Sequence, residues 1–401
     1  MARLWDKGLP LDERILRFTA GEDHRLDARL VEYDVRGSIA HARMLAKQGL
    51  LENDACEAIC SGLTALAESH AAGEWEISLE DEDCHSALER RLTDAIGPAG
   101  GRVHLGRSRN DQVLTAMRLY LKDAAAHLSE LCGHVVEALD QLSERQGQIP
   151  LPGYTHMQPA MPSSVALWAG GFSAELADDR DGLLAAARRA DRSPLGSAAG
   201  YGVGELPLDR EATRLALGFD SIHEPVTAVQ LSRGKAEASL VFELALTVGD
   251  LGRLASDLLL FYMREIAFVT LPKAMTTGSS IMPQKRNPDV FELVRGAQAT
   301  ISGALTEILG ITAKLSSGYH RDLQRLKPPL FRSIDLTEDC LEIMAHALAG
   351  VRFQPENIEL GNELYAADRA NQLVVSEGIP FREAYRRIAA EFAKDDSGSE
   401  E

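Results

Sequence analysis

The 401-residue sequence is poor in aromatic residues and in positive charge. It contains 3 Trp, 8 Tyr and 11 Phe, whereas 45% of its residues are hydrophobic. The core must therefore be built mainly from Leu, Ala, Val and Ile, which favours helices. Lys and Arg number 42 against 60 Asp and Glu, so the formal net charge is −18. This charge opposes broad electrostatic binding to nucleic acid or an anionic membrane, and we expect neither partner.

We also expect no targeting segment and no paired cysteines. The N-terminal stretch MARLWDKGLPLDERIL has no apolar core of signal-peptide length. No run approaches the roughly 20 apolar residues of a membrane span. The five cysteines form no CxxC pair, which favours reduced thiols and a cytoplasmic location. Cys56 with Cys60, and Cys84 with His85, provide too few ligands to indicate a metal, so we expect neither a metal nor another cofactor.

Long stretches without proline predict long helices. These stretches cover 99–149, 163–193, 226–271, 289–327 and 330–354. In three of them apolar residues recur at alternating spacings of four and three, from Met117 to Leu142, from Leu240 to Phe261 and from Val290 to Leu315. Only Thr247 in the second series is polar. The pattern predicts an all-α fold with a bundle of helices roughly 40–50 Å long.

The same windows suggest a division of the chain. We expect an N-terminal helical domain over 1–104, a central long-helix bundle domain over 105–355 and a short C-terminal helical domain over 356–401. The helix around Leu240–Phe261 is also apolar off its seam, at Val241, Leu259 and Leu260. One chain offers few neighbours for such surfaces, so we expect the chain to associate with copies of itself.

Four polar segments lie where long helices begin or end: HLGRSRNDQ (104–112), GYTHMQP (153–159), TGSSIMPQKRNPD (277–289) and SSGYHRDLQRLK (316–327). Three of them begin or lead into a helix, where free N–H groups favour anions. In the first, Ser108, Asn110 or Asp111 could each serve as a helix cap. Because two arginines accompany them, we favour a carboxylate-binding site.

The other three segments and a glycine-rich stretch give support of different strength for a functional site. A lone histidine in 153–159 is weak support by itself. In 277–289, Asn287 makes a natural N-cap, and Gly278 with two serines predicts a mobile segment that closes over a ligand. The charge run in 316–327 could instead be a solvated face. GYGVG at 200–204 has the wrong spacing for a phosphate loop, and no HExxH, GxSxG or GxxxxGK[ST] occurs.

These segments carry a specific resemblance. GSSIMPQKRNPD resembles the signature loop of the aspartase/fumarase superfamily, whose members are homotetrameric lyases built on a long-helix bundle. Together with GRSRNDQ, PGYTH and YHRDLQ, it resembles the argininosuccinate lyase family, from about residue 15 to 385. The resemblance implies a small-molecule substrate, argininosuccinate, which β-elimination splits into arginine and fumarate. The intermediate is an aci-carboxylate dianion, which requires preorganised cations and N–H donors.

The resemblance also implies roles for individual residues. Ser279 would be the base, Lys285 would stabilise the dianion, and His156 paired with Glu292 would assist protonation of the leaving guanidinium, directly or through water. The succinyl carboxylates would be held by Ser108, Arg109, Asn110, Thr155 and Asn287. The arginine portion would be held by Tyr319, Gln324 and Lys327, and Arg233 aligns with a family arginine. Each site would be assembled from three subunits of the homotetramer.

The sequence departs from the family pattern in three places. Leu105 stands where Thr is usual, LSRGK (231–235) replaces SDRD, and the C-terminal domain is several dozen residues short. Two alternatives therefore stay open beside argininosuccinate lyase. One is a lyase of the same superfamily acting on another succinyl-amine adduct. The other is a non-catalytic structural homologue of the crystallin kind.

Overall fold

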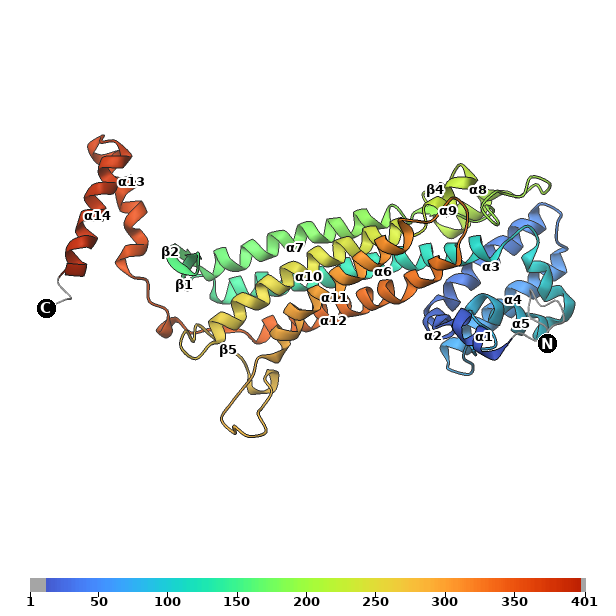
Figure 1. The fold of residues 1–401 in the computed structure, drawn as a ribbon, viewed down its shortest axis with the longest axis horizontal. Coiled ribbons are helices and arrows are strands. Elements are labelled where there is room, and N and C mark those ends of the chain that lie inside the picture. The colour runs from blue at the N-terminus through green and yellow to red at the C-terminus, as the bar shows by residue number, and fades with distance from the viewer. Residues whose placement is uncertain (1–11, 398–401) are drawn as a thin grey trace. The chain divides into compact units, whose positions relative to one another are not determined.

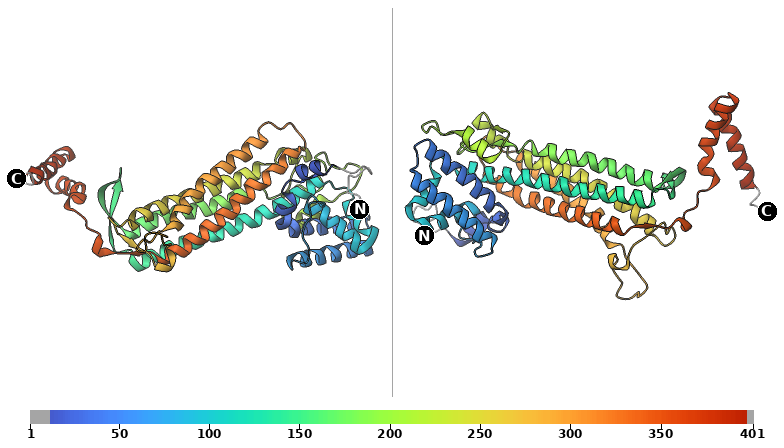
Figure 2. Two further views of the ribbon diagram at one scale, coloured as in Figure 1. Left: turned by 60° about the horizontal axis from the view of Figure 1, so that its bottom comes forward. Right: turned by 180° about the vertical axis from the view of Figure 1, so that it is seen from behind.

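The computed structural model describes residues 12–397 and is built almost entirely of helices (Figure 1). It divides into two compact units. Unit 1 comprises Met1–Glu130, Asp179–Leu246 and Gln298–Glu338, and unit 2 comprises Leu131–Asp178, Thr247–Ala297 and Asp339–Glu401. Five long helices contribute segments to both units: α6 (Arg109–Gln146), α7 (Val165–Ala187), α10 (Lys235–Tyr262), α11 (Asp289–Thr312) and α12 (Lys327–Gly350). Within each unit these segments run side by side (Figure 2).

Shorter elements complete unit 1. The helices and 3-10 turns are α1 (Glu13–Ala20), α2 (Asp23–Leu26), η1 (Asp27–Leu30), α3 (Val31–Lys47), α4 (Asn53–Ala71), α5 (Cys84–Ile96), η2 (Gly97–His104), α8 (Arg210–Leu217), α9 (Val226–Leu231) and η4 (Arg321–Leu326). Two short parallel strands, β3 (Arg192–Ser193) and β4 (Ser221–Ile222), join the segments that flank α8.

Unit 2 carries two antiparallel strand pairs and a helical C-terminal segment. Its strands are β1 (Pro150–Thr155) with β2 (Gln158–Ser164), and β5 (Val269–Thr270) with β6 (Arg352–Phe353). Its remaining elements are η3 (Lys273–Met275), η5 (Pro355–Asn357), η6 (Asn362–Tyr365), α13 (Ala366–Glu377) and α14 (Phe381–Ser397). Helices α13 and α14 share a small core of Ala370, Ala384 and Ile388. The predicted boundaries 1–104, 105–355 and 356–401 stay a prediction, because the two units follow spatial contacts rather than chain order.

The predicted seams are the buried faces of the long helices. All seven members of the Leu240–Phe261 series on α10 are buried, including Thr247. In the α6 series only Ala124 is half-buried, and in the α11 series the members from Val294 to Ile308 are buried. The all-α prediction is confirmed. Off the α10 seam, Val241 is buried, whereas Leu259 and Leu260 are half-buried.

Large apolar side chains remain on the outer faces of three long helices in the single chain. Leu167 on α7 is 70% exposed and Leu293 on α11 is 74% exposed, and Phe242 and Leu246 on α10 are also exposed. In the part of the chain that the structure describes, no helix has the length and apolarity that a membrane crossing requires.

Candidate active site

A polar cavity of about 130 Å³ lies in unit 1, and we call it the unit 1 pocket. Its walls come from α1, α2, α6, η4 and α12 and from the segments before α5, α10 and η4. It is lined by Ala20, Asp23, Glu82, Asp83, Arg109, Asn110, Val113, Arg233, Tyr319, Arg321, Gln324 and Lys327. The pocket thus brings together Arg109, Asn110, Arg233, Tyr319, Gln324 and Lys327, which come from three separate sequence motifs.

The start of α6 fixes two of these side chains. The Ser108 hydroxyl accepts a hydrogen bond from the Asn110 N–H (3.3 Å), and Asp111 Oδ1 accepts one from the Ser108 N–H (2.9 Å). This reciprocal arrangement is a capping box, which holds Arg109 and Asn110 in the first helical turn. Ser108 therefore has a capping role in the structure, and its role toward a substrate carboxylate stays a prediction.

Arg109 is held by the neighbouring α5 terminus. Its Nη1 lies 3.2 Å from Asp83 Oδ2 and donates to the Ser86 hydroxyl at 3.1 Å. Asp83 is also the N-cap of α5, where it accepts from the Ser86 N–H at 2.9 Å. One carboxylate thus caps a helix and orients the arginine that lines the pocket.

Arg233 enters the same pocket as a buried cation with unused donors. Its residue is 9% exposed, and within residues 12–397 its buried Nε and Nη1 have no hydrogen-bond partner. Its guanidinium carbon lies 5.9 Å from the centre of the Tyr319 ring. Because an unsatisfied buried donor is costly, this geometry favours an anionic ligand beside Arg233.

The LSRGK departure has a local structural reason. The Ser232 hydroxyl accepts from Nη2 of the buried Arg118 at 2.7 Å. Gly234 has a φ of 82°, in the left-handed region that favours glycine. The second departure, Leu105, makes a hydrogen bond through its backbone: its carbonyl oxygen accepts from His41 Nε2 at 2.8 Å. The Leu105 side chain is 41% exposed. Ser232 and Gly234 thus have local structural roles beside Arg233, and Leu105 makes its hydrogen bond through its backbone.

Lys327 is paired with two carboxylates. Its Nζ lies 3.0 Å from Asp23 Oδ2 and 2.6 Å from Asp27 Oδ1. Burial by itself would lower the pKa of Lys327, but Asp27 and Asp23 raise it well above its usual value. The ammonium therefore stays charged and anchors the base of the pocket.

Sequence reasoning missed the acidic side of the pocket, which consists of Asp23, Glu82 and Asp83. The available signal was the acidic stretch LEDEDCH (79–85) together with EDHRLD (22–27), which the family resemblance covers. The Glu82 carboxylate lies 3.7 Å from Arg321, Asp83 faces Arg109 and Asp23 faces Lys327, so each of the three acids is matched by a cation.

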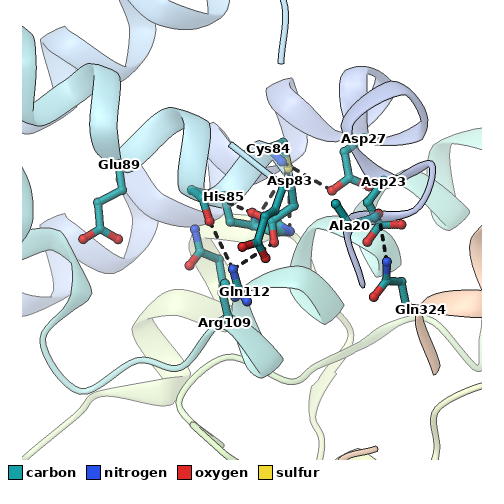
Figure 3. A network of polar contacts seen from close by, with 12 residues as sticks. Ala20, Asp23, Asp27, Asp83, Cys84, His85, Glu89, Arg109, Gln112 and Gln324 are labelled. Atoms are coloured by element: carbon teal, nitrogen blue, oxygen red, sulfur yellow. Dashed lines mark hydrogen bonds and ion pairs between the residues drawn. The ribbon is translucent and has the colours of Figure 1, made fainter. Parts of the chain in front are cut away.

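A buried ion pair lies behind the pocket, where Figure 3 shows His85 beside Gln112 and Asp83. His85 Nδ1 and Asp34 Oδ2 are 2.8 Å apart, and both side chains are 1% exposed. Burial alone would lower the pKa of His85, but Asp34 raises it; burial alone would raise the pKa of Asp34, but His85 lowers it. Gln112 Nε2 donates to both Asp34 oxygens (2.9 and 3.0 Å), so the pair joins α3, α5 and α6.

Asp27, Cys84 and His85 are the described residues that could hold a metal, since their ligand atoms lie within 4.8 Å of one another (Figure 3). Their chemistry suits an ion-pair network better. The Lys327 ammonium already neutralises Asp27, and burial followed by nearby carboxylates raises the pKa of the Cys84 thiol well above its usual value. A protonated thiol is a poor metal ligand.

In unit 2, the signature loop (277–289) is closed at its base by an antiparallel bridge. Thr277 and Asn287 exchange backbone hydrogen bonds of 3.0 and 2.9 Å, and the Thr277 hydroxyl donates to Asp289. Between these residues the Ser279 hydroxyl accepts from the N–H groups of Ile281 (3.4 Å) and Met282 (3.2 Å). These amides would stabilise negative charge on the Ser279 oxygen.

Two other parts of unit 2 carry predicted residues. Lys285, Asn287 and Glu292 line one open cavity of about 1050 Å³ beside the α10 C-terminus. Thr155 and His156 lie at the tip of the β1–β2 hairpin, where Thr155 pairs with Gln158. His156 and Met157 have φ values of 53° and 61°, as a two-residue type I′ turn requires. Such strain in non-glycine residues is typical of functional sites, and the pairing of His156 with Glu292 stays a prediction.

Comparisons with known proteins identify the family of this chain. The family model described as Lyase matches residues 11–303. An argininosuccinate lyase of Sorangium cellulosum is 48% identical over 393 residues, which cover 98% of this chain and 91% of that protein. An argininosuccinate lyase of Thermotoga neapolitana is 41% identical over 395 residues, which cover 98% of this chain and 99% of that protein.

Solved structures show the same fold. An EDDS lyase variant with bound fumarate superposes with a TM-score of 0.81 at 26% identity, covering 97% of this chain and 78% of that chain. A class II fumarase of Schistosoma mansoni superposes with a TM-score of 0.79 at 19% identity, covering 96% of this chain and 91% of that chain. At this identity the likeness supports the fold alone. The chain therefore belongs to the Lyase family and, within it, to the argininosuccinate lyases.

Proposed function

We propose that the protein catalyses the reversible β-elimination of argininosuccinate to arginine and fumarate, the last step of arginine biosynthesis. The observation that carries this proposal is the unit 1 pocket, where Arg233 has unused buried donors beside Tyr319, Gln324 and Lys327. The family resemblance predicts that Tyr319, Gln324 and Lys327 contact the arginine portion, and it aligns Arg233 with a family arginine. The free cysteines suit the reducing environment of a cytoplasm.

The elimination begins with loss of a proton from the carbon next to a succinyl carboxylate. Ser279 takes this proton, and the electron pair moves into the carboxylate to form the aci-carboxylate dianion. Lys285 and N–H donors of the loop stabilise that charge. The electron pair of the dianion then forms the carbon–carbon double bond of fumarate as the carbon–nitrogen bond breaks. The electrons of that bond remain on the guanidino nitrogen, and His156 with Glu292 assists protonation of this nitrogen directly or through water. Ser108, Arg109, Asn110, Thr155 and Asn287 hold the succinyl carboxylates.

Ser279 can act as a base only if its alkoxide is stabilised. An unperturbed hydroxyl would rarely lose its proton near neutral pH. The N–H groups of Ile281 and Met282 already point at the Ser279 oxygen, and Lys285 lies on the same loop. Both favour the charged form and would therefore lower the pKa of the hydroxyl when the loop closes.

We also infer a homotetramer in which three subunits build each site. The exposed apolar side chains on α7, α10 and α11, including Leu167, Leu293 and Phe242, are suited to burial against the same helices of other copies. The predicted site residues fall into two sets: Arg109, Arg233 and Tyr319 belong to unit 1, whereas Ser279 and Lys285 belong to unit 2. Symmetric association would bring sets from different subunits together.

The direct test is to mix purified protein with argininosuccinate and to follow fumarate by its ultraviolet absorbance. We expect fumarate and arginine in equal amounts. If a well-folded tetramer produced no fumarate, the proposal would be wrong. Turnover of a different succinyl-amine adduct would then support another lyase of the superfamily, and inertness toward all such adducts would support a structural homologue.

Site sharing predicts that two inactive variants restore each other. Arg233→Gln changes the unit 1 set and Ser279→Ala the unit 2 set. When equal amounts are dissociated and reassembled together, about a quarter of the sites should combine the unchanged residues of both subunits. We therefore expect partial recovery of fumarate production in the mixture. Each variant reassembled alone is the control, and an inactive mixture of mixed tetramers would contradict a shared site.

A further inference from the structure

The carboxylate of Asp111 connects the start of α6 to a distant loop. Its Oδ1 accepts the Ser108 N–H (2.9 Å) in the capping box. Its Oδ2 accepts the N–H groups of Gly196 (3.0 Å) and Ala198 (2.8 Å), which lie 85 and 87 residues further along the chain. The Asp111 side chain is fully buried. Because a helix cap requires only the first of these contacts, the second oxygen has a separate role.

The loop that meets this oxygen, residues 194–200, has an unusual backbone. Gly196 has a φ of 86° and Ala198 a φ of 49°, both in the left-handed region that favours glycine. A side chain at Gly196 would also collide with Arg210, whose Cγ lies 2.8 Å from the position of an added Cβ. Strain of this kind persists only where the surrounding contacts impose it. Here it directs two N–H groups at one carboxylate oxygen.

The contact matters for the unit 1 pocket because Asp111 follows Arg109 and Asn110, which line it. A second contact holds the other end of the same turn: an added Cβ on Gly106 would lie 3.0 Å from Leu206 Cδ1. The turn 106–111 is therefore held at both ends by the chain segment 194–208. The directions in which its side chains enter the pocket depend on that segment.

The chemistry of this connection requires a carboxylate. Within residues 12–397 the Asp111 side chain makes no salt bridge, and its three hydrogen bonds all come from N–H donors. An ionised carboxylate only accepts hydrogen bonds and can accept on both oxygens. Burial raises the pKa of the Asp111 carboxyl against the opposing effect of the Ser108 and Ala198 N–H groups. An asparagine has one oxygen and could accept from Ser108 or from the loop, but not from both.

We propose that Asp111 is a positioning residue for the succinyl half of the substrate. It is buried and does not line the pocket, so it acts through the turn that it ties to the 194–200 loop. The proposal rests on the proposed function, in which Ser108, Arg109 and Asn110 hold the succinyl carboxylates. Residues between 319 and 327 hold the arginine portion from other elements. Loss of the Asp111 connection should therefore weaken the two halves of the site unequally.

The test measures the binding of succinate and of L-arginine to the intact protein by calorimetry. Asp111→Asn should weaken succinate binding at least about tenfold, the effect of losing a hydrogen bond to a charged group. It should leave the affinity for L-arginine within about twofold. With argininosuccinate as substrate, KM should rise by a similar factor while kcat stays within about threefold, because the residues that transfer protons are unchanged.

Asp209→Asn is the matched control. It makes the same chemical change in the chain segment that holds the turn, where the Asp209 carboxylate caps α8 by accepting the Ala212 N–H at 2.9 Å. Asparagine caps a helix as well as aspartate does. This variant should therefore keep the wild-type affinities for both ligands and the wild-type KM.

A measurement on the wild type tests the same connection without a variant. The 194–200 loop lies outside the residues that line the unit 1 pocket. If Asp111 ties it to the turn, succinate should slow amide hydrogen exchange in this loop, since a ligand that stabilises the turn also stabilises its hydrogen bonds. Exchange that succinate leaves unchanged would contradict the proposal, even if Asp111→Asn did not fold.

The other results that would overturn this role are an unchanged succinate affinity in Asp111→Asn, equal weakening of both ligands, and a loss of kcat at constant KM. Thermal unfolding and native mass verify the fold and assembly of each variant. Fumarate production by the wild type separates the two hypotheses. Wild-type turnover with an unaltered Asp111→Asn variant refutes only the role of Asp111. A wild type that makes no fumarate and binds neither ligand refutes the proposed function.

Discussion

Replacing Ser279 with alanine is expected to lower kcat for argininosuccinate by roughly 100- to 10,000-fold, the range that a positioned general base contributes. The Ser279 hydroxyl accepts hydrogen bonds from two loop amides, which stabilise the charged oxygen more than the neutral one. Alanine removes the proton acceptor and leaves the unit 1 pocket intact. We therefore expect KM to change little, and arginine binding measured by calorimetry to match the wild type.

The neighbouring serine is the matched control. Ser280 is exposed on the same loop, and Ser280→Ala removes an equivalent hydroxyl one residue away. It should retain most of the wild-type kcat when fumarate is followed by absorbance. Wild-type rates in Ser279→Ala would refute this base. An equal loss in both variants would mean that the loop conformation, and not the Ser279 hydroxyl, limits turnover.

The helical scaffold could be predicted from local pattern. A seam with spacings of four and three recurs over several turns, so a single misplaced residue does not hide it. The buried series on α10 matches the prediction even at Thr247, because a continuous seam can bury one small polar side chain. The β1–β2 hairpin was less visible. Its turn residues, His156 and Met157, lack the Asn-Gly or Gly sequence by which such turns are usually found.

The candidate site could be predicted only in part, because some of its residues are brought together only by tertiary folding. Arginines and lysines in polar motifs indicate where an anion could bind, and six of the predicted site residues line one pocket. Their acidic partners depend on tertiary folding: Lys327 and Asp27 are 300 residues apart in the sequence yet form a 2.6 Å ion pair. Sequence periodicity contains no information on such pairings. Asp23 could therefore be assigned to the pocket only from the folded structure.

The buried pair of Asp34 and His85 should contribute strongly to stability. Asp34→Asn replaces an acceptor by an amide, yet Gln112 and His85 both still direct donors at this position. Removing one partner of a buried pair typically costs about 3–5 kcal/mol, because the other charge is left uncompensated. We expect a decrease of that order in the free energy of unfolding by urea at fixed protein concentration. Asp335→Asn is the control, since its pair with Arg29 is exposed and should contribute at most about 1 kcal/mol.

The pH dependence of this stability follows from the two pKa shifts. The lowered pKa of Asp34 contributes stability that is present above its unfolded value near 3.8 and is lost as the pH falls through the lower folded value. The raised pKa of His85 contributes stability that is present below its unfolded value near 6.5 and is lost as the pH rises through the higher folded value. Between these unfolded values both contributions are complete, so the deficit of Asp34→Asn should be largest there and should shrink toward either extreme. A deficit that stayed constant across the pH range would show that Asp34 stabilises the protein by packing and neutral hydrogen bonds rather than as one half of an ion pair.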